Sequence, residues 1–417
     1  MSFDVVLNAL GSVENHIKGV LLDVPYDVKR ESLERAKELF LKWLDVYKTY
    51  TNGYRQELLA RTQRHTIRML SSFANDLDNQ VRDVFEARIA SEAYLLVNNL
   101  FKSFSRVSRP SFVLAEDREF KQTSIATLLN DKLKNLTVPR PVIGSANVDV
   151  TIRDVQNKDI IVICYDQGQF DNVFSWPLLL HEAFHYLYAN ERLDRLAKDC
   201  PKVSWLEEAL IDMYIINYFG PAYALSLATY LQRFPHEKTI SHPSFTSRIF
   251  IALQYLKKTQ EAKKLPLPVS NHIADVFDYL KRIWDQHKEA DPLEVQEQVA
   301  KIYDSAEKDV KEIISEKAQP FAEFLSQNEK KRQEVFQKGG FEYIENQVLS
   351  VSDVADYFRA GIPTAADPRI VFNSFISRQS QEMINDPKAH IFVKESLKKW
   401  HLKNAWVEAK GQAHRST

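Results

Sequence analysis

Glycine is scarce in this chain, which has only 10 glycines among its 417 residues. Folds rich in strands and tight turns use glycine more often, so this count favours helices. The segment 31–50 supports that interpretation, because its apolar residues recur every three or four positions with charged residues between them. These apolar residues are Leu33, Ala36, Phe40, Trp43, Leu44 and Tyr47. The pair Asn52-Gly53 is expected to end this helix, and a second helical pattern extends from residue 58 to 101.

The middle of the chain has a different pattern. After a predicted helix at 121–136, short runs rich in β-branched residues predict a small sheet. The runs lie at 142–143, 148–152 and 160–165. Helices are predicted again at 176–196, at 205–219 and from residue 245 to the end. We therefore expect a mainly α fold with a small β-sheet, in the α+β class.

Composition excludes several classes of protein. The 55 Lys and Arg residues balance 56 Asp and Glu residues, so no global field attracts nucleic acid or an anionic membrane. The chain has no run of 18 apolar residues and no basic leader, so we expect a cytoplasmic protein without a membrane span. Two cysteines, Cys164 and Cys200, are too few for a disulfide scaffold or a zinc site built from cysteine alone.

One short motif points to chemistry. Residues 181–185 read His-Glu-Ala-Phe-His, a His-Glu-x-x-His pattern inside a predicted helix. His181 and His185 lie one turn apart on the same helix face, so both imidazoles can bind one metal ion. Glu182 lies beside that ion without binding it, where it can take a proton from a zinc-bound water that attacks a carbonyl. The alternative is a charged helix with two polar residues on its outer face.

A zinc hydrolase needs a third protein ligand, and the next predicted helix supplies candidates. Ser204 and Glu207 have the spacing of a capping box, which predicts that a helix starts there. Glu208 and Asp212 then share one face of that helix. Glu208 can complete a His, His, Glu ligand set, and Asp212 can accept the free ring N–H of a ligand histidine. We prefer Glu208 to Glu207 as the ligand, because Glu207 already has a role at the cap.

The strand predicted at 160–165 directly precedes the motif helix. At the edge of a sheet, such a strand can hold an extended peptide by main-chain hydrogen bonds beside the metal. An ordinary sheet strand is the alternative interpretation of the same residues.

Together the two motifs resemble those of the gluzincin metallopeptidases, in which His-Glu-x-x-His is followed by a helix carrying Glu-x-x-x-Asp. A further segment, 241–249, is similar to the His-Pro-x-x-x-x-Arg-Ile segment of the CAAX prenyl protease and stress-induced membrane endopeptidase group. The resemblance implies that His242 stabilises the oxyanion and that Arg248 supports the metal-binding carboxylate or the substrate. His236 competes more weakly for the role of His242. The membrane spans of that group are missing here, so its membrane substrates are not expected.

The resemblance implies a zinc metallopeptidase that binds one Zn²⁺ per chain and hydrolyses peptide or protein substrates. The Gly-x-Met-Glu-Asn motif of the aminopeptidase branch is absent, which favours an endopeptidase. We expect a zincin-like catalytic core at 116–260, flanked by helical regions at 1–115 and 261–417. The flanking regions could hold a protein partner.

Two alternatives stay open. The first is a zincin-fold binding or scaffold protein that keeps the metal site and cleaves little or nothing. The second is a helical interaction protein in which the motif occurs by accident. Hydrolysis of a broad panel of substrates would separate the first alternative from a peptidase, and metal content would separate the second.

Overall fold

Helices make up most of the fold, with one small sheet among the described residues. The computed structural model describes residues 2–20, 26–57, 60–85, 90–104, 111–117, 121–124, 160–166, 172–190, 207–208, 211–212, 215–216, 218–231, 248–249, 252–253, 256, 267–287, 351–375 and 386–413. The chain divides into two compact units. Unit 1 comprises Met1–Tyr94 and Ser105–Phe170, and unit 2 comprises Leu95–Phe104 and Asp171–Thr417.

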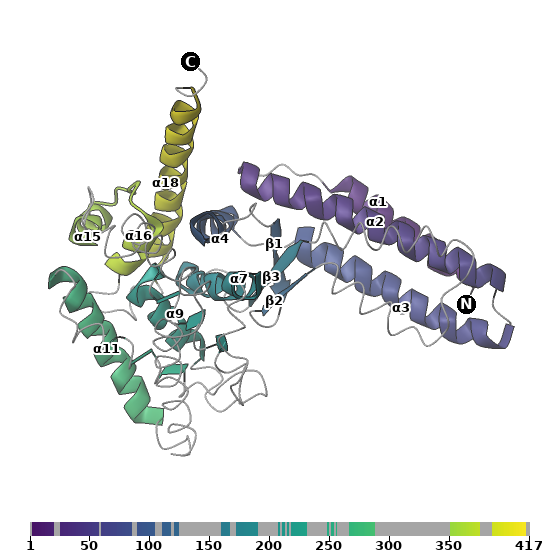
Figure 1. The fold of residues 1–417 in the computed structure, drawn as a ribbon, viewed down its shortest axis with the longest axis horizontal. Helices are drawn as coiled ribbons and strands as arrows, with labels where there is room; N and C mark the ends of the chain where they lie inside the picture. The colour runs from purple at the N-terminus through teal and green to yellow at the C-terminus, as the bar shows by residue number, and fades with distance from the viewer. Residues whose placement is uncertain are drawn as a thin grey trace, which may run out of the picture. The chain divides into compact units, whose positions relative to one another are not determined.

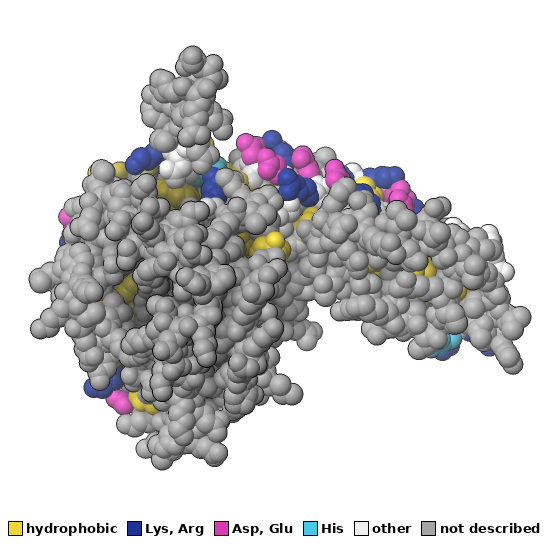
Figure 2. Space-filling model, viewed as in Figure 1, with side chains coloured by type: hydrophobic (Ala, Val, Ile, Leu, Met, Phe, Trp, Pro, Cys, Tyr) yellow, Lys and Arg dark blue, Asp and Glu magenta, His cyan; other side chains and the backbone are white. Residues whose placement is uncertain are grey.

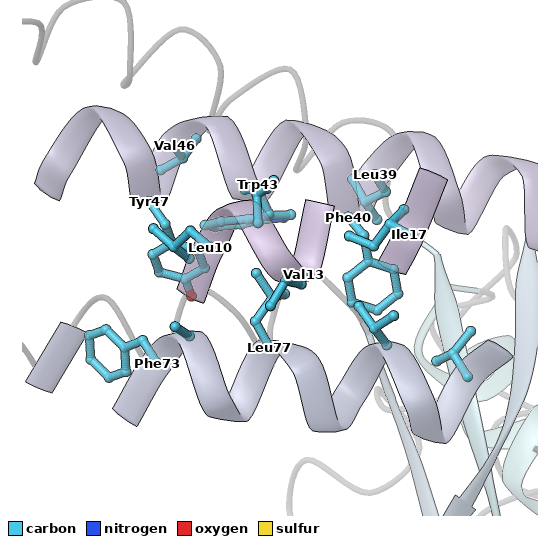
Figure 3. Packing of buried hydrophobic residues seen from close by; sticks show 14 of the residues in the cluster. Leu10, Val13, Ile17, Leu39, Phe40, Trp43, Val46, Tyr47, Phe73 and Leu77 are labelled. Atoms are coloured by element: carbon cyan, nitrogen blue, oxygen red, sulfur yellow. The ribbon is translucent and has the colours of Figure 1, made fainter. Parts of the chain in front are cut away.

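Three long helices form the larger part of unit 1 (Figure 1). They are α1 (Phe3–Gly19), α2 (Asp27–Glu57) and α3 (Ala60–Phe85), and α4 (Ser91–Phe104) follows them in the chain. Their facing sides bury a continuous apolar core (Figure 3). Its labelled members are Leu10, Val13, Ile17, Leu39, Phe40, Trp43, Val46, Tyr47, Phe73 and Leu77. The helix predicted at 31–50 is confirmed, and its apolar stripe is the side of α2 that this core covers.

Two predicted helix ends differ from the structure. The Asn52-Gly53 pair lies inside α2, which continues to Glu57. Glycine in a helix costs about 1 kcal/mol relative to alanine. Burial of Tyr50 and Tyr54, whose rings stack with centroids 6.2 Å apart, offsets that cost. The pattern at 58–101 is not one helix, because α3 ends at Phe85 and α4 begins at Ser91.

A three-stranded sheet completes the described part of unit 1, with the strand order β1-β3-β2. β1 (Phe112–Asp117) pairs in parallel with β3 (Ile161–Asp166), and β2 (Lys121–Ser124) pairs with β3 in the antiparallel sense. β1 also packs against α2 and α3. The strand predicted at 160–165 is therefore confirmed as β3. It has a neighbour on each side, so the expectation of an edge strand free to hold a peptide is wrong.

The helix predicted at 121–136 is wrong at its start, because residues 121–124 form β2. Pairing with β3 supplies the hydrogen bonds that a helix would have made locally, and tertiary pairing overrides local preference. Strand β1 was not predicted. Residues 125–136 and the runs at 142–143 and 148–152 lie outside the described residues.

The described residues of unit 2 form helices joined by turns and loops, with no strand among them. Its elements are the 3₁₀ helix η2 (Val173–Ser175), α7 (Pro177–Asn190), α9 (Pro221–Leu231), α11 (Leu267–His287), α15 (Val351–Arg359), α16 (Pro368–Ser374) and α18 (Pro387–Ala413). Residues 207–208, 211–212, 215–216 and 218–219 are also helical and are called the 207–219 segment below. α9 packs against α7, α11, η2 and α16 and so lies at the centre of this unit.

The described surface is mixed in charge. Acidic and basic side chains alternate over the helices of unit 1 that are visible in Figure 2. Two ion pairs on this surface join Lys18 to Glu14 and Arg55 to Asp4. Among the described helices, none combines the length and the apolar character that a membrane span requires. The division of the chain at residues 115 and 260 stays a prediction.

Candidate metal centre

Helix α7 carries the His-Glu-x-x-His motif in a buried setting. Asn172 caps the preceding 3₁₀ helix by accepting a hydrogen bond from the Phe174 N–H at 3.0 Å, and α7 begins at Pro177, a residue suited to the first helical position. His181 is only 3% exposed, so the interpretation as an outer, solvent-facing helix surface is wrong. The rings of His181 and His185 lie 4.9 Å apart with their planes at 84°. Ligand atoms of His181, Glu182 and His185 lie within 4.8 Å of one another, which suits a shared metal ion.

The 207–219 segment brings a carboxylate to both imidazoles. Glu208 Oε2 lies 3.0 Å from His181 Nε2, and Glu208 Oε1 lies 3.3 Å from His185 Nε2. Glu208 is only 3% exposed. The three side chains predicted as ligands therefore converge, although Glu208 is more than twenty residues beyond the motif in the chain.

The donor set of these three side chains fits a metal ion. The distances of 3.0 and 3.3 Å from the two Glu208 oxygens to the imidazoles are those of hydrogen bonds and ion pairs, which a bound metal ion would replace. Two imidazoles and one carboxylate are also ligand types that zinc accepts. Among the described residues, the one group of His, Cys, Asp and Glu side chains placed to hold a metal ion is His181, Glu182 and His185, and Glu208 lies within 3.3 Å of both histidines.

The outer nitrogen of each histidine faces a second carboxylate. His181 Nδ1 lies 2.9 Å from Asp212 Oδ1, as expected for an acceptor of the free ring N–H. His185 Nδ1 lies 2.9 Å from Glu207 Oε1. These pairs hold each ring so that Nε2 points toward Glu208. The role of Glu207 at His185 was not predicted, because the sequence assigned this side chain to a helix cap.

Arg248 closes the buried side of the centre. Its Nε donates to Asp212 Oδ2 at 2.8 Å, and one terminal nitrogen donates to Asp212 Oδ1 at 2.6 Å. The other terminal nitrogen lies 3.6 Å from Glu208 Oε2. This two-pronged pairing neutralises Asp212 in a site where Arg248 itself is only 7% exposed. The structure thus pairs Arg248 with Asp212 and places it 3.6 Å from Glu208, the carboxylate predicted as a ligand, and its support of metal or substrate stays a prediction.

Sequence analysis missed Tyr223, which lies on α9 and is fully buried. Its hydroxyl donates to Asp212 Oδ1 and lies 3.0 Å from His181 Nδ1. The one local signal is the Gly220-Pro221 pair, which ends one helix and starts the next and so returns the chain toward Asp212. Tyr218, in the 207–219 segment, is also buried, and Asn99 donates to its hydroxyl at 2.9 Å.

The charges of the centre control its protonation. Burial alone would lower the pKa of His185, but hydrogen bonds to Glu207 and Glu208 outweigh burial and raise that pKa from 6.5 to about 10. Burial acts in the same direction on His181, whose pKa is nevertheless raised by Asp212 and Glu208. Without a metal ion, His185 therefore holds a proton at neutral pH, and the direction of the shift favours the protonated ring of His181 as well.

The pKa values of the carboxylates Glu208 and Asp212 shift in the opposite direction. Burial raises the pKa of a carboxyl group, but the two imidazoles hold the pKa of Glu208 well below its ordinary value of 4.5. Arg248 and His181 likewise outweigh burial and lower the pKa of Asp212 to about 2. Both groups are therefore ionised, so a metal ion that enters competes with protons on the histidines and finds the carboxylates already charged.

Some predicted site residues lie outside the described residues. They are His242, its competitor His236 and the capping residue Ser204. Their predicted roles stay predictions.

Comparisons with protein-family models, curated proteins and solved structures found no match to this chain. The site is therefore described from its own geometry, as a buried His-Glu-x-x-His group that can hold a metal ion.

Proposed function

We propose that this protein is a zinc-dependent metallopeptidase of the gluzincin type, and that it acts as an endopeptidase with a zincin-like core. The observation that carries the proposal is the approach of the Glu208 carboxylate to Nε2 of both His181 and His185, at 3.0 and 3.3 Å. In other zinc hydrolases, two histidines and a glutamate leave one coordination position for water or substrate. A charged surface helix would have no reason to bury such a group.

Glu182 is the group on this chain suited to move the proton. A bound zinc ion would supply a Lewis acid that lowers the pKa of water and polarises a carbonyl. In the proposal, Glu182 accepts a proton from the attacking water and passes it to the leaving amine. His181, His185 and Glu208 hold the ion, so the base and the ligands are separate side chains. His242 stays the proposed partner of the developing oxyanion.

The remaining attributes are also proposals. Imidazole ligands suit cobalt, nickel and copper as well as zinc, and we propose one Zn²⁺ per chain because the ligand set matches zinc hydrolases. We propose peptide or protein substrates, a cytoplasmic location, no nucleic-acid or membrane partner, and a protein partner held by the helical flanks.

Metal content tests the centre first. We expect about one zinc per chain in protein purified without a metal-affinity tag, and loss of zinc in His185→Ala and Glu208→Ala, because each change removes one ligand. Glu395→Gln is the matched control, since this residue pairs with Lys398 on α18 and does not touch the centre. A wild-type chain that stays free of zinc after exposure to zinc at neutral pH would contradict the proposal.

Hydrolysis tests the chemistry. We expect Glu182→Gln to keep its zinc and to lose about 10²–10⁴-fold of its activity on casein or a broad peptide panel, because general acid–base catalysis contributes that much. A near wild-type rate in Glu182→Gln would remove this residue from the mechanism. Zinc-loaded wild-type protein that hydrolyses none of these substrates would favour the alternative, a zincin-fold binding protein.

A further inference from the structure

Asn373, near the C-terminal end of α16, has a fully buried side chain with three hydrogen bonds. Its Oδ1 accepts from the backbone N–H of Ala222 at 2.8 Å. Its Nδ2 donates to the backbone carbonyl oxygens of Phe219 at 2.7 Å and Arg369 at 2.6 Å. The bonds to Ala222 and Phe219 join α16 to the backbone on either side of the Gly220-Pro221 turn. A short helix more than 150 residues beyond that turn in the chain therefore holds its backbone.

This turn, Gly220-Pro221, joins the 207–219 segment to α9, and both of these elements contribute side chains to the candidate metal centre. Gly220 has a φ of 90°, a conformation that glycine adopts at little cost, and its N–H donates to Ile216 O at 2.8 Å. The next residue, Pro221, begins α9, and Tyr223 follows two residues later. Helix ends leave backbone groups without partners inside their helix. Asn373 supplies partners for one such carbonyl before the turn and one such N–H after it.

Aromatic packing keeps α16 in place against this turn. Phe372, the neighbour of Asn373, contacts Phe219 with ring centroids 5.2 Å apart and Phe174 at 6.1 Å. Phe375 contacts Phe174 at 5.4 Å. Phe174 belongs to η2, which directly precedes α7. The residues around Asn373 therefore pack against the segments that lead into both α9 and α7, so the amide is held by more than its own hydrogen bonds.

The turn determines where the Tyr223 hydroxyl lies. This hydroxyl donates to Asp212 Oδ1 and lies 3.0 Å from His181 Nδ1. Asp212 belongs to the segment before the turn, whereas Tyr223 belongs to the helix after it. A change in the angle of the turn would therefore move the hydroxyl away from Asp212, and Asp212 is the carboxylate that orients the His181 ring.

We propose that Asn373 is a positioning residue for the metal centre, which acts by holding the Gly220-Pro221 turn so that Tyr223 reaches Asp212 and His181. The inference rests on the metal site of the proposed function and does not depend on peptide hydrolysis. It gives α16, a helix far beyond the turn in the chain, a role in metal binding.

Zinc affinity of the full-length, metal-free protein tests this role. We expect Tyr223→Phe to weaken zinc binding about tenfold, because loss of a group that helps to orient a metal ligand lowers the affinity for the metal. We expect Asn373→Ala to weaken zinc binding by a similar factor. Ser374→Ala is the matched control, because it removes a buried hydrogen bond from the same helix, to Val371 O at 2.7 Å, without touching the turn. Asn373→Ser serves if the alanine variant does not fold, since its hydroxyl can still donate to Arg369 O within α16 while the two bonds to the turn are lost.

A double-mutant cycle separates positioning from general destabilisation. If Asn373 acts through Tyr223, the double variant should bind zinc no more weakly than Tyr223→Phe alone, because the interaction is already lost. The visible spectrum of bound Co²⁺ should change in both single variants and stay unchanged in Ser374→Ala. These readouts report the coordination geometry, which a loss of folding stability alone would leave unaltered.

Specific results would overturn the inference. Asn373 variants that lower the unfolding temperature but keep wild-type zinc affinity and the wild-type Co²⁺ spectrum would make Asn373 purely structural. Additive losses in the cycle would show that Asn373 does not act through Tyr223. Failure of the proposed function has a different signature, since wild-type protein would then bind zinc without hydrolysing peptides while the Asn373 effect persisted.

Discussion

The three-helix core of unit 1 and the metal centre of unit 2 are both buried, but they are built from opposite kinds of side chain. Trp43 and Leu77 lie in a core of apolar and aromatic side chains that pack against one another. In the candidate metal centre, His181, Asp212 and Arg248 are also buried, and each has a charged partner within 3.0 Å. The core is held by area removed from water, and the centre is held by pairing of charges.

Because one region is held by apolar burial and the other by paired charges, the two regions should tolerate different substitutions. A smaller apolar side chain in the helical core leaves a cavity, whose cost depends on how far the neighbours can relax. Removal of one charge from the centre leaves its partner buried and unpaired, which no relaxation of packing repairs. The same difference makes the centre sensitive to pH and to metal, whereas the helical core should respond to neither.

The largest difference between the two regions should be their response to pH. Zinc must displace protons from His181 and His185, because the pKa of each is raised in the metal-free protein. We expect release of at least one proton per zinc, because the pKa of His185 is about 10, so the association constant should rise at least about 100-fold between pH 6 and pH 8. Calorimetric titration in buffers of different ionisation enthalpy measures the protons released. A pH-independent affinity in this range would mean that the imidazoles are already neutral.

Loss of the buried guanidinium should be the most damaging single substitution for stability. We expect Arg248→Met to lower the free energy of unfolding by about 3–5 kcal/mol, because Asp212 loses the buried cation that donates two hydrogen bonds to it. Chemical denaturation of the metal-free protein measures this change. Arg282→Met on the exposed side of α11 is the control and should cost far less. Equal losses in the two variants would contradict the buried ion pair.

A cavity in the helical core should cost somewhat less and leave the centre untouched. Leu77 is fully buried between the helices shown in Figure 3. We expect Leu77→Ala to lower the free energy of unfolding by about 2–5 kcal/mol. Zinc affinity of the folded variant should stay within about twofold of wild type, since packing in this core is not part of ligand orientation. A larger change in zinc affinity would mean that the two regions are coupled.

Asp212 and Glu207 each face the outer nitrogen of one histidine, and they should differ in how strongly they support zinc binding. The Asp212 side chain is 1% exposed, whereas that of Glu207 is 30% exposed. We expect Asp212→Asn to weaken zinc binding about 100-fold and Glu207→Gln about tenfold, because solvent weakens the more exposed pair. Competition with a chromophoric chelator measures both. The reverse order would show that His185 depends on its partner more than His181 does.

The smallest effect should come from a surface ion pair of unit 1. Arg55 and Asp4 lie 2.9 Å apart, with side chains 51% and 61% exposed. We expect Asp4→Asn to change the free energy of unfolding by less than about 1 kcal/mol and to leave zinc affinity unchanged. Denaturation at low and high salt checks the prediction, since screening should reduce even this small difference. A loss comparable with that of Arg248→Met would remove the distinction between surface and buried charge.

Local periodicity predicted the helices well where apolar residues repeat, as at 31–50, and predicted their ends poorly. Gly53 did not end α2, because neighbouring tyrosines are buried on both sides of it. Residues 121–124 adopted a strand because β3 offered a partner. Strand β1 has little signal of its own, since it is stabilised by pairing with a strand nearly 50 residues away.

The candidate site was predictable as far as spacing within one helix could reach. The four-residue separation places His181 and His185 together, and it does the same for Glu208 and Asp212. Spacing did not predict the role of Glu207, because a helix cap and a contact with His185 are equally compatible with its position.

Local spacing is therefore enough to predict two helices that each carry a pair of candidate metal-site side chains, since helical geometry follows from it. Only the tertiary structure decided that Arg248 pairs with Asp212, that the Tyr223 hydroxyl joins them and that Asn373 holds the turn between their helices. The physical reason is that each of these contacts depends on how a turn directs one helix against another. That direction results from the packing of residues far apart in the chain, which no local pattern encodes.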